Sequence, residues 1–284
     1  MSDAAGTSAD QFFDALWADY VAMAPQAGRI QAAFQERGEV IVNDHVAFRT
    51  LALEPIGLEA LEPHLLALGY ERFAPYEFPA KKLRAYGYLH PTTGAGGGDG
   101  TRVSRPRVFL SELLTDQLSA DAQAILRRCA GQVDATRVGR PDIFWAGRLW
   151  DPISWDEYQM LAAESEYAAW MATIGIRPNH FTISVTDLVH HTSVEQVLGV
   201  VEGLGYAVNA SGGRVKGSPE VLLEQGSTLA DEMPMPFAGG ETHPAPTCYY
   251  EFAKRYPQPD GQLFQGFVAA SADKIFESTD KRGG

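Results

Sequence analysis

The chain has 284 residues, 45% of them hydrophobic, and a formal net charge of −13. This length and apolar content allow a substantial buried core in one large or two small domains. The acidic balance argues against a nucleic-acid partner, because clustered lysine and arginine supply most of that affinity, and favours a small-molecule role. The polar start is unlike a secretory signal, and no stretch approaches the roughly 20 apolar residues that span a bilayer. We therefore expect a cytoplasmic protein without a membrane partner.

The first predicted elements are helical. Residues 9–36 have apolar side chains at helical spacing, at Phe12, Leu16, Tyr20 and Met23, and Asp10 is the expected N-cap. We expect these helices on the outside of the protein. Residues 94–100 are rich in glycine and predict a flexible hairpin connection. They lack the Lys-Ser/Thr ending of a phosphate-binding loop.

Two stretches resemble each other, and both open at a histidine. The first contains Asp44-His45-Val46-Ala47-Phe48-Arg49, then apolar residues at helical spacing (Leu58, Leu61, Leu65), then Leu68-Gly69-Tyr70. The second contains Asn179-His180-Phe181-Thr182-Ile183-Ser184, then Val194, Val197 and Val201, then Leu204-Gly205-Tyr206. The histidine precedes the glycine by 24 residues in the first stretch and by 25 in the second. A strand, a helix and a glycine turn are therefore predicted twice.

Each copy ends in an apolar strand that carries a glutamate, Glu112 in the first and Glu251 in the second. Glu112 follows His45 by 67 residues and Glu251 follows His180 by 71, which makes Glu112 the expected counterpart of Glu251. Each unit is predicted to contain a strand, a helix and several further strands, an α+β arrangement with a curved, mainly antiparallel sheet. Duplicated units usually pack symmetrically, so we expect the two units to enclose a barrel-like cavity.

We expect a single domain over residues 1–284. Its parts are unit one (about 40–115), a helical insertion (about 116–175), unit two (about 176–256) and a C-terminal extension (257–284).

The insertion and the extension are predicted from composition. The insertion has a helical pattern at 118–130 and many aromatic residues at 142–174, which favours an outer helical layer or lid. The extension begins with a turn at 257–261 and is strand-like at first over 264–276. Its polar residues 277–280 reach the cavity only if the chain folds back.

The paired histidines and one glutamate predict a metal site. Two histidines and a carboxylate on three strands leave up to three open positions on an octahedral metal, the facial arrangement of non-haem Fe(II) oxygenases. A single strand histidine is more often a hydrogen-bonded core residue than a ligand. The occurrence of His45 and His180 at the same place in both repeats favours the ligand interpretation, with Glu251 as the carboxylate.

Arg49 is expected to share a strand face with His45 and Ala47, because alternate residues point to the same side. It would lie roughly 13 Å along the strand from His45 at about 3.3 Å per residue. A guanidinium there suits a substrate carboxylate, which it can bind through two hydrogen bonds. The alternative is that Arg49 pairs with Asp44 or Glu54 at the surface.

Other polar residues are weaker candidates for substrate binding. Ser184 lies on the strand of His180, and Lys216, Gln225 and Ser227 belong to the later strands of unit two. Gln225 and Ser227 share a face and either orient substrate oxygens or cap a turn. The remaining histidines and the two cysteines, Cys129 and Cys248, lack the partners or spacing of a metal site. In particular, His190 and His191 are expected at an exposed helix start.

Taken together, five segments resemble the 2-oxoadipate dioxygenase/decarboxylase family over about residues 10–280. The segments are Asp44-His45-Val46-Ala47-Phe48-Arg49-Thr50, Arg177-Pro178-Asn179-His180-Phe181-Thr182, Leu223-Glu224-Gln225-Gly226-Ser227-Thr228, Tyr250-Glu251-Phe252 and Phe276-Glu277-Ser278-Thr279. The resemblance implies a fold akin to the vicinal oxygen chelate superfamily, built from βαβββ units.

The same resemblance implies a mononuclear Fe(II) held by His45, His180 and Glu251, with Arg49 on a substrate carboxylate. The implied reaction converts 2-oxoadipate and O2 to 2-hydroxyglutarate and CO2, a step in lysine catabolism. Two other functions remain open. One is a metal-dependent isomerase or lyase with Glu112 as an additional ligand, and the other is a non-catalytic small-molecule binding protein. Two histidines and a glutamate also accept Zn, Ni, Co or Mn.

Overall fold

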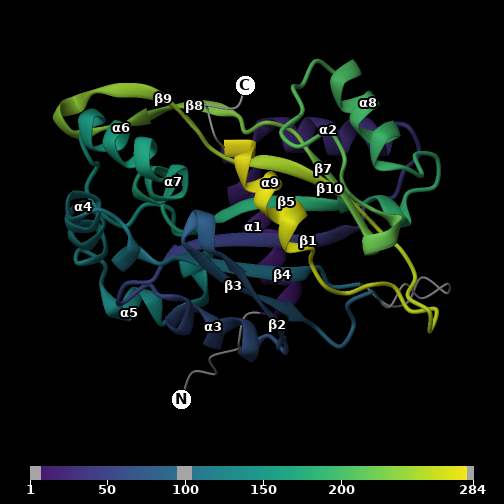
Figure 1. Cartoon of the computed structure of the whole chain (residues 1–284), viewed down its shortest axis with the longest axis horizontal. Helices are drawn as coiled ribbons and strands as arrows, with labels where there is room; N and C mark the ends of the chain where they lie inside the picture. The colour runs from purple at the N-terminus through teal and green to yellow at the C-terminus, as the bar shows by residue number, and fades with distance from the viewer. Residues whose placement is uncertain (1–7, 95–103, 280–284) are drawn as a thin grey trace.

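The computed structural model describes residues 8–94 and 104–279. Its centre is an eight-stranded sheet with the order β2-β3-β4-β1-β5-β10-β7-β6, which curls into a half-barrel with helices around it (Figure 1). The predicted α+β class is therefore confirmed. Most of the predicted glycine-rich connection, 95–100, lies outside the described residues.

The two predicted units form the two halves of this sheet. Unit one contains β1 (Asn43–Leu51), α3 (Leu58–Ala67), β2 (Glu71–Phe78), β3 (Leu83–Leu89) and β4 (Arg107–Leu113). Unit two contains β5 (Pro178–Ser184), α8 (Val194–Gly203), β6 (Lys216–Ser218), β7 (Leu223–Ser227) and β10 (Tyr249–Arg255). The first strand of each unit pairs in parallel with the last, β1 with β4 and β5 with β10. The units join where β1 and β5 pair antiparallel.

The repeated Leu-Gly-Tyr sequence ends the helix in both units by the same mechanism. Gly69 and Gly205 have φ angles of +88° and +90°, in the left-handed region that favours glycine. The following tyrosine amide reaches back to the last turn, Tyr70 to Leu65 O at 3.1 Å and Tyr206 to Val201 O at 3.2 Å. This is the Schellman arrangement of a helix C-terminus.

Helices α1 (Ala9–Met23) and α2 (Pro25–Glu36) cover the outer face of the sheet. Side chains that alternate with the histidines, such as Phe181 on β5, pack there against Trp17 and Tyr20 of α1. The helix pair was predicted, but the N-cap at Asp10 is wrong. Ser8 caps α1 and forms a capping box with Gln11, so Asp10 lies within the first turn.

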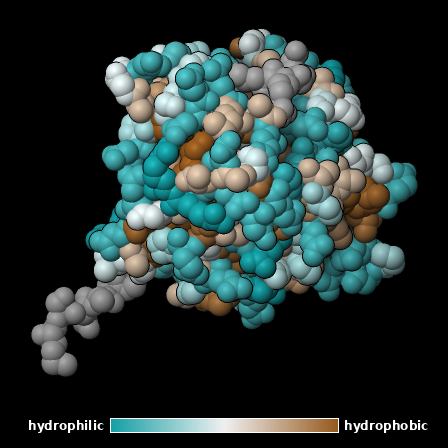
Figure 2. All heavy atoms as spheres, turned by 60° about the vertical axis from the view of Figure 1, so that its left-hand side comes forward, coloured by the Kyte–Doolittle hydropathy of each residue, from teal (hydrophilic) through white to brown (hydrophobic). Residues whose placement is uncertain are grey.

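The segment predicted as an insertion is helical. It contains α4 (Ala120–Ala130), α5 (Ala135–Val138), α6 (Trp155–Glu164) and α7 (Glu166–Ile174). Helix α7 packs on β1, and a hairpin of β8 (Glu232–Pro236) and β9 (Thr242–Pro246) lies beyond α6 (Figure 1). Figure 2 brings this side forward and shows a mostly hydrophilic surface with a recessed hydrophobic area. Short 3-10 turns occupy Pro79–Lys81, Thr115–Gln117, Pro141–Trp145, Val185–Asp187, Pro219–Val221 and Ala238–Gly240.

The C-terminal extension folds back over the inner face of the sheet. The prediction of a strand-like start over 264–276 is wrong, because the chain runs through an irregular segment into α9 (Ala269–Ile275) and a 3-10 turn (Phe276–Thr279). Helix α9 contacts β2 from one half of the sheet and β6 and β7 from the other, and it crosses in front of the sheet in Figure 1. It therefore closes the open side of the half-barrel. Among the described helices, none is long and apolar enough to cross a membrane.

Candidate metal centre

Three adjacent strands bring His45, His180 and Glu251 together on the inner face of the sheet. They lie on β1, β5 and β10, and one donor atom from each lies within 4.8 Å of the others. The two Nε2 atoms are 3.3 Å apart. Oε2 of Glu251 lies 3.1 Å from Nε2 of His180, and Oε1 lies 3.5 Å from Nε2 of His45. All three side chains are buried.

These donors fit a divalent metal ion. Oε2 of Glu251 is buried and accepts no hydrogen bond from any described residue, although the His180 ring is close. Burial alone would raise the pKa of Glu251, but the two histidines hold it well below its usual range, so the carboxylate is ionised. Burial lowers the pKa of His180, which favours the neutral, metal-binding form of the ring. Two imidazoles and a carboxylate are ligands that Fe(II) and similar ions accept.

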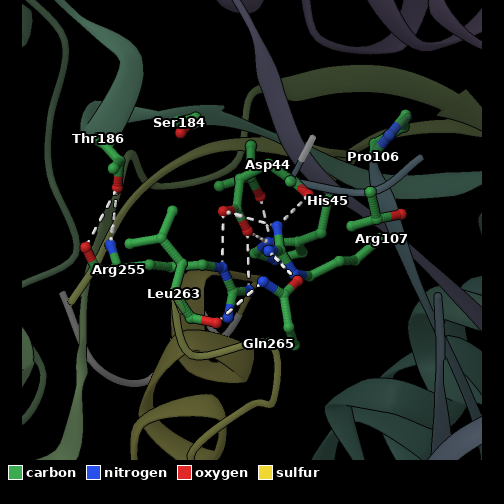
Figure 3. A network of polar contacts seen from close by, with 12 residues as sticks. Asp44, His45, Pro106, Arg107, Ser184, Thr186, Arg255, Leu263 and Gln265 are labelled. Atoms are coloured by element: carbon green, nitrogen blue, oxygen red, sulfur yellow. Dashed lines mark hydrogen bonds and ion pairs between the residues drawn. The ribbon is translucent and has the colours of Figure 1, made fainter. Parts of the chain in front are cut away.

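Asp44 forms a hydrogen bond with the Nδ1 side of the His45 ring, and two arginines form ion pairs with Asp44. Its carboxylate accepts a 2.8 Å hydrogen bond from Nδ1 of His45, with Arg255 at 2.7 and 2.9 Å and Arg107 at 3.2 Å. Figure 3 shows Asp44 at the centre of these contacts. Burial would raise the pKa of Asp44, but Arg255 and Arg107 keep it well below its usual range. The ionised Asp44 retains the proton on Nδ1 and leaves Nε2 as the nitrogen that could bind a metal.

The second histidine has a different support. Nδ1 of His180 lies 3.2 Å from the amide oxygen of Asn179, the neutral counterpart of Asp44. The ring also stacks on Tyr249, with 4.6 Å between centroids. The two halves therefore place the same residue type at the site with unequal electrostatic support, and the ionised Asp44 makes His45 the more basic ring.

Arg49 lies farther along the same face of β1 and is 1% exposed. Its Nη1 donates to Glu166 at 2.7 Å and its Nη2 to Thr279 at 3.0 Å, while Tyr167 and Trp170 of α7 lie against the guanidinium. The surface pairing with Asp44 or Glu54 is therefore wrong. Glu166 was not predicted as a site residue, because no local pattern shows which strand α7 packs against.

The space at the metal centre is about 20 Å³, roughly the size of one water molecule. Sheet residues form its floor, and Phe267, Ala272, Ile275 and Phe276 of the C-terminal extension form its roof. A larger cavity of about 360 Å³ lies between α6, α7 and β9, and Glu166 and Thr279 line it. The Arg49 partners thus stand at the boundary of an outer cavity of ligand-binding size.

Comparison with known proteins identifies the family. The sequence matches the family described as 2-oxoadipate dioxygenase/decarboxylase over residues 13–138 and 143–262. The chain belongs to this family. The Arabidopsis thaliana protein named 2-oxoadipate dioxygenase/decarboxylase, chloroplastic, is 38% identical over 83% of this chain and 67% of its own length. The rice (Oryza sativa subsp. japonica) protein named 2-oxoadipate dioxygenase/decarboxylase, chloroplastic/amyloplastic, is 36% identical over 98% of this chain and 81% of its own.

Solved structures agree with the family and the fold. Hydroxyglutarate synthase from Oryza sativa, in complex with 2-oxoadipate, superimposes with a TM-score of 0.88 and 33% identity, covering 100% of this chain and 98% of that one. A glyoxalase superfamily protein from Ralstonia eutropha JMP134 superimposes with a TM-score of 0.75 at 22% identity, covering 95% and 90%. The second likeness concerns the fold alone, and it bears out the expected vicinal oxygen chelate-like architecture.

The prediction that Glu112 is the counterpart of Glu251 is wrong. Glu251 pairs with Thr182, which is two residues after His180. The corresponding residue of unit one is Ala47, two residues after His45, and it pairs with Phe109. Glu112 lies on the outer face of β4, where it accepts a 2.8 Å hydrogen bond from the amide of Leu58 and an ion pair from Arg84. It caps the first turn of α3.

The other predicted substrate-binding residues occupy different positions. Gln225 lines the metal cavity and donates a 2.7 Å hydrogen bond to Oε1 of Glu251. Ser227 lies 2.9 Å from Ser278 of the extension. Lys216 donates to the carbonyl of Asn209, and Ser184 donates to Asp187 at a separate cleft.

Proposed function

We propose that this protein is a 2-oxoadipate dioxygenase/decarboxylase that uses Fe(II) to convert 2-oxoadipate and O2 to 2-hydroxyglutarate and CO2. The equation balances in carbon, oxygen and hydrogen without a further reductant. The observation that carries the proposal is the buried His45, His180 and Glu251 cluster on the same face as Arg49, in a chain that belongs to this family. The named plant relatives and the 2-oxoadipate complex of the rice protein support the substrate.

The iron, when bound, would supply a chelation site for the 2-oxo acid and the electrons that activate dioxygen. The chain's own residues prepare that site. Asp44 holds the proton on Nδ1 of His45, and Gln225 holds Oε1 of Glu251, which leaves Nε2 and Oε2 for the metal. With three protein ligands, positions remain for the substrate and for dioxygen.

Arg49 would bind the carboxylate at the far end of 2-oxoadipate and so hold the chain in one orientation. Glu166 and Thr279 hold its guanidinium in place. The roof of Phe267, Ile275 and Phe276 would keep bulk water from the reacting groups.

The test is oxygen uptake after anaerobic reconstitution with Fe(II). Addition of 2-oxoadipate should start oxygen consumption, and His180→Ala should abolish both metal binding and uptake. Bound iron without oxygen consumption would refute the oxygenase proposal. The isomerase or lyase alternative invoked Glu112 as a ligand, and its position on the outer face of β4, where it caps α3, removes that support.

Two finer points belong to the same proposal. A role in lysine catabolism follows from the substrate and is tested by growth of a deletion strain on lysine. Cytoplasmic residence remains a prediction from composition, and both plant relatives are named as plastid proteins.

A further inference from the structure

Tyr249 stands at the metal centre but is not among the residues predicted from the sequence. It lies two residues before Glu251 on β10, so both side chains point to the inner face. Its ring stacks on the His180 ring at 4.6 Å with an interplanar angle of 24°. The side chain is fully buried and lines the metal cavity.

The hydroxyl group of Tyr249 has no hydrogen-bond partner among residues 8–94 and 104–279. Three other buried polar atoms near the metal centre also have no hydrogen-bond partner within the described chain: Nε of Arg49, Oε1 of Gln225 and Oε2 of Glu251. Most buried polar groups in folded proteins are paired. Tyr249, Gln225 and Glu251 line the metal cavity, and such a group of unpaired polar atoms at one cavity indicates a bound ligand that completes them.

Tyr249 lies on the side of Glu251 that is nearer to Arg49, because it pairs with His180, which pairs with Ala47, two residues before Arg49 on β1. A tyrosine hydroxyl can donate one hydrogen bond, and a ligand oxygen in the cavity would supply the acceptor that it lacks. Arg49 offers an unpaired Nε–H donor beside it, since its Nη1 and Nη2 are engaged by Glu166 and Thr279.

We propose that Tyr249 is a substrate-binding residue whose hydroxyl donates a hydrogen bond to the carboxylate farthest from the metal, next to Arg49. This inference rests on the proposed function. Two buried donors without partners would be completed by a second carboxylate and left unpaired by a methyl group. Such a site discriminates strongly against the analogue that lacks the acceptor. Tyr249 and Arg49 would thus select dicarboxylic over monocarboxylic 2-oxo acids.

The duplication supports a special role for this position. Tyr249 pairs with His180 as Arg107 pairs with His45. In unit one the position serves the metal ligand, because Arg107 holds Asp44 behind His45. In unit two the corresponding side chain stacks on the ligand ring and leaves its hydroxyl free for the substrate.

The test compares Tyr249→Phe with Tyr250→Phe. Tyr250 is equally buried, its hydroxyl is also unpaired within the described residues, and it packs on the outer face against Trp17 and Phe252. Calorimetry on the Ni(II)-loaded proteins would measure the Kd of 2-oxoadipate and of 2-oxohexanoate, which has a methyl group in place of the far carboxylate. Nickel occupancy is measured in parallel.

Tyr249→Phe should raise the Kd of 2-oxoadipate about tenfold, as expected for a lost hydrogen bond to a charged group. It should leave 2-oxohexanoate binding and nickel occupancy unchanged, and Tyr250→Phe should change neither Kd. Because phenylalanine keeps the ring and removes an unpaired hydroxyl, the thermal midpoint without ligand should not fall.

An unchanged Kd for 2-oxoadipate in Tyr249→Phe would overturn the inference, as would equal losses for both acids, which would place the hydroxyl at the metal-bound end. A loss of nickel would show that Tyr249 acts through His180 instead. If the wild-type protein bound 2-oxoadipate no better than 2-oxohexanoate, the proposed substrate itself would be wrong.

Discussion

Phe109 and Glu251 occupy equivalent positions in the two halves of the sheet. Phe109 pairs with Ala47, two residues beyond His45, and Glu251 pairs with Thr182, two residues beyond His180. Both side chains line the metal cavity. The duplicated fold therefore repeats the histidine but has the carboxylate in one half only, so a bound metal would receive no protein ligand from the position of Phe109.

Glu251→Gln should lower metal affinity by more than about 100-fold. This is a larger loss than mutation of a residue that only hydrogen-bonds to a metal ligand typically causes. Glu112→Gln is the matched control on the other half. It should keep a full equivalent of metal but lose about 1 kcal/mol of stability, because Glu112 caps α3. Metal analysis and urea unfolding measure the two effects. Loss of metal in Glu112→Gln would contradict this division of roles.

Asp44→Asn should weaken metal binding about 10–100-fold, because the amide no longer fixes the Nδ1 proton of His45. Asn179→Ala removes the corresponding contact from His180 and should cost less, since Asn179 is neutral. Competition with a chromophoric chelator measures both affinities. Equal losses in the two variants would argue against the inferred electrostatic inequality of the two histidines.

Arg49→Lys should raise the Kd of 2-oxoadipate about tenfold while metal occupancy stays unchanged. Lysine keeps the positive charge beside Glu166 but has no counterpart of the unpaired Nε–H donor that Arg49 would offer to the substrate carboxylate. Calorimetry with the Ni(II)-loaded protein provides the measurement. Retention of the wild-type Kd would remove Arg49 from the substrate site.

Glu39 provides a pH-dependent contribution to stability away from the metal. Its buried carboxylate accepts hydrogen bonds from the amides of Val189, His190 and His191 and contacts the His191 ring. Burial would raise its pKa, but these contacts lower it from 4.5 to about 2. Because the folded-state pKa is depressed, the contribution is complete above about pH 4.5 and is lost as the pH falls toward 2.

Glu39→Gln should therefore be less stable than the wild type by about 2 kcal/mol at neutral pH. The difference should shrink between pH 4.5 and 2. Urea unfolding at several pH values measures it, with the exposed Glu36→Gln as a control for the loss of one charge. A stability difference that did not depend on pH would assign the effect to packing.

The sequence was sufficient to predict the positions of residues that depend on local repetition. His45, His180 and Arg49 follow from the strand period of two and from the repeat itself. Tyr249 was accessible by the same argument, since it precedes Glu251 by two residues on one strand. The error at Glu112 arose because the spacing between motifs differs in the two units, so the true counterpart, Phe109, appears only in the strand pairing.

Local sequence patterns could not predict contacts between distant segments of the chain. Glu166 meets Arg49 because α7 packs on β1, and Thr279 meets both because the extension folds back across the sheet. The strand-like composition of residues 264–267 led to a wrong prediction. The carbonyls of Phe264 and Gly266 accept hydrogen bonds from Arg255 and not from a neighbouring strand. Tertiary contacts decided these conformations.

The most direct measurement is the product balance of the Fe(II)-loaded protein when O2 limits the reaction with 2-oxoadipate. The proposed function predicts one CO2 and one 2-hydroxyglutarate for each O2 consumed, and neither product without oxygen. Release of CO2 in the absence of oxygen, or no reaction by protein that holds a full equivalent of iron, would contradict it.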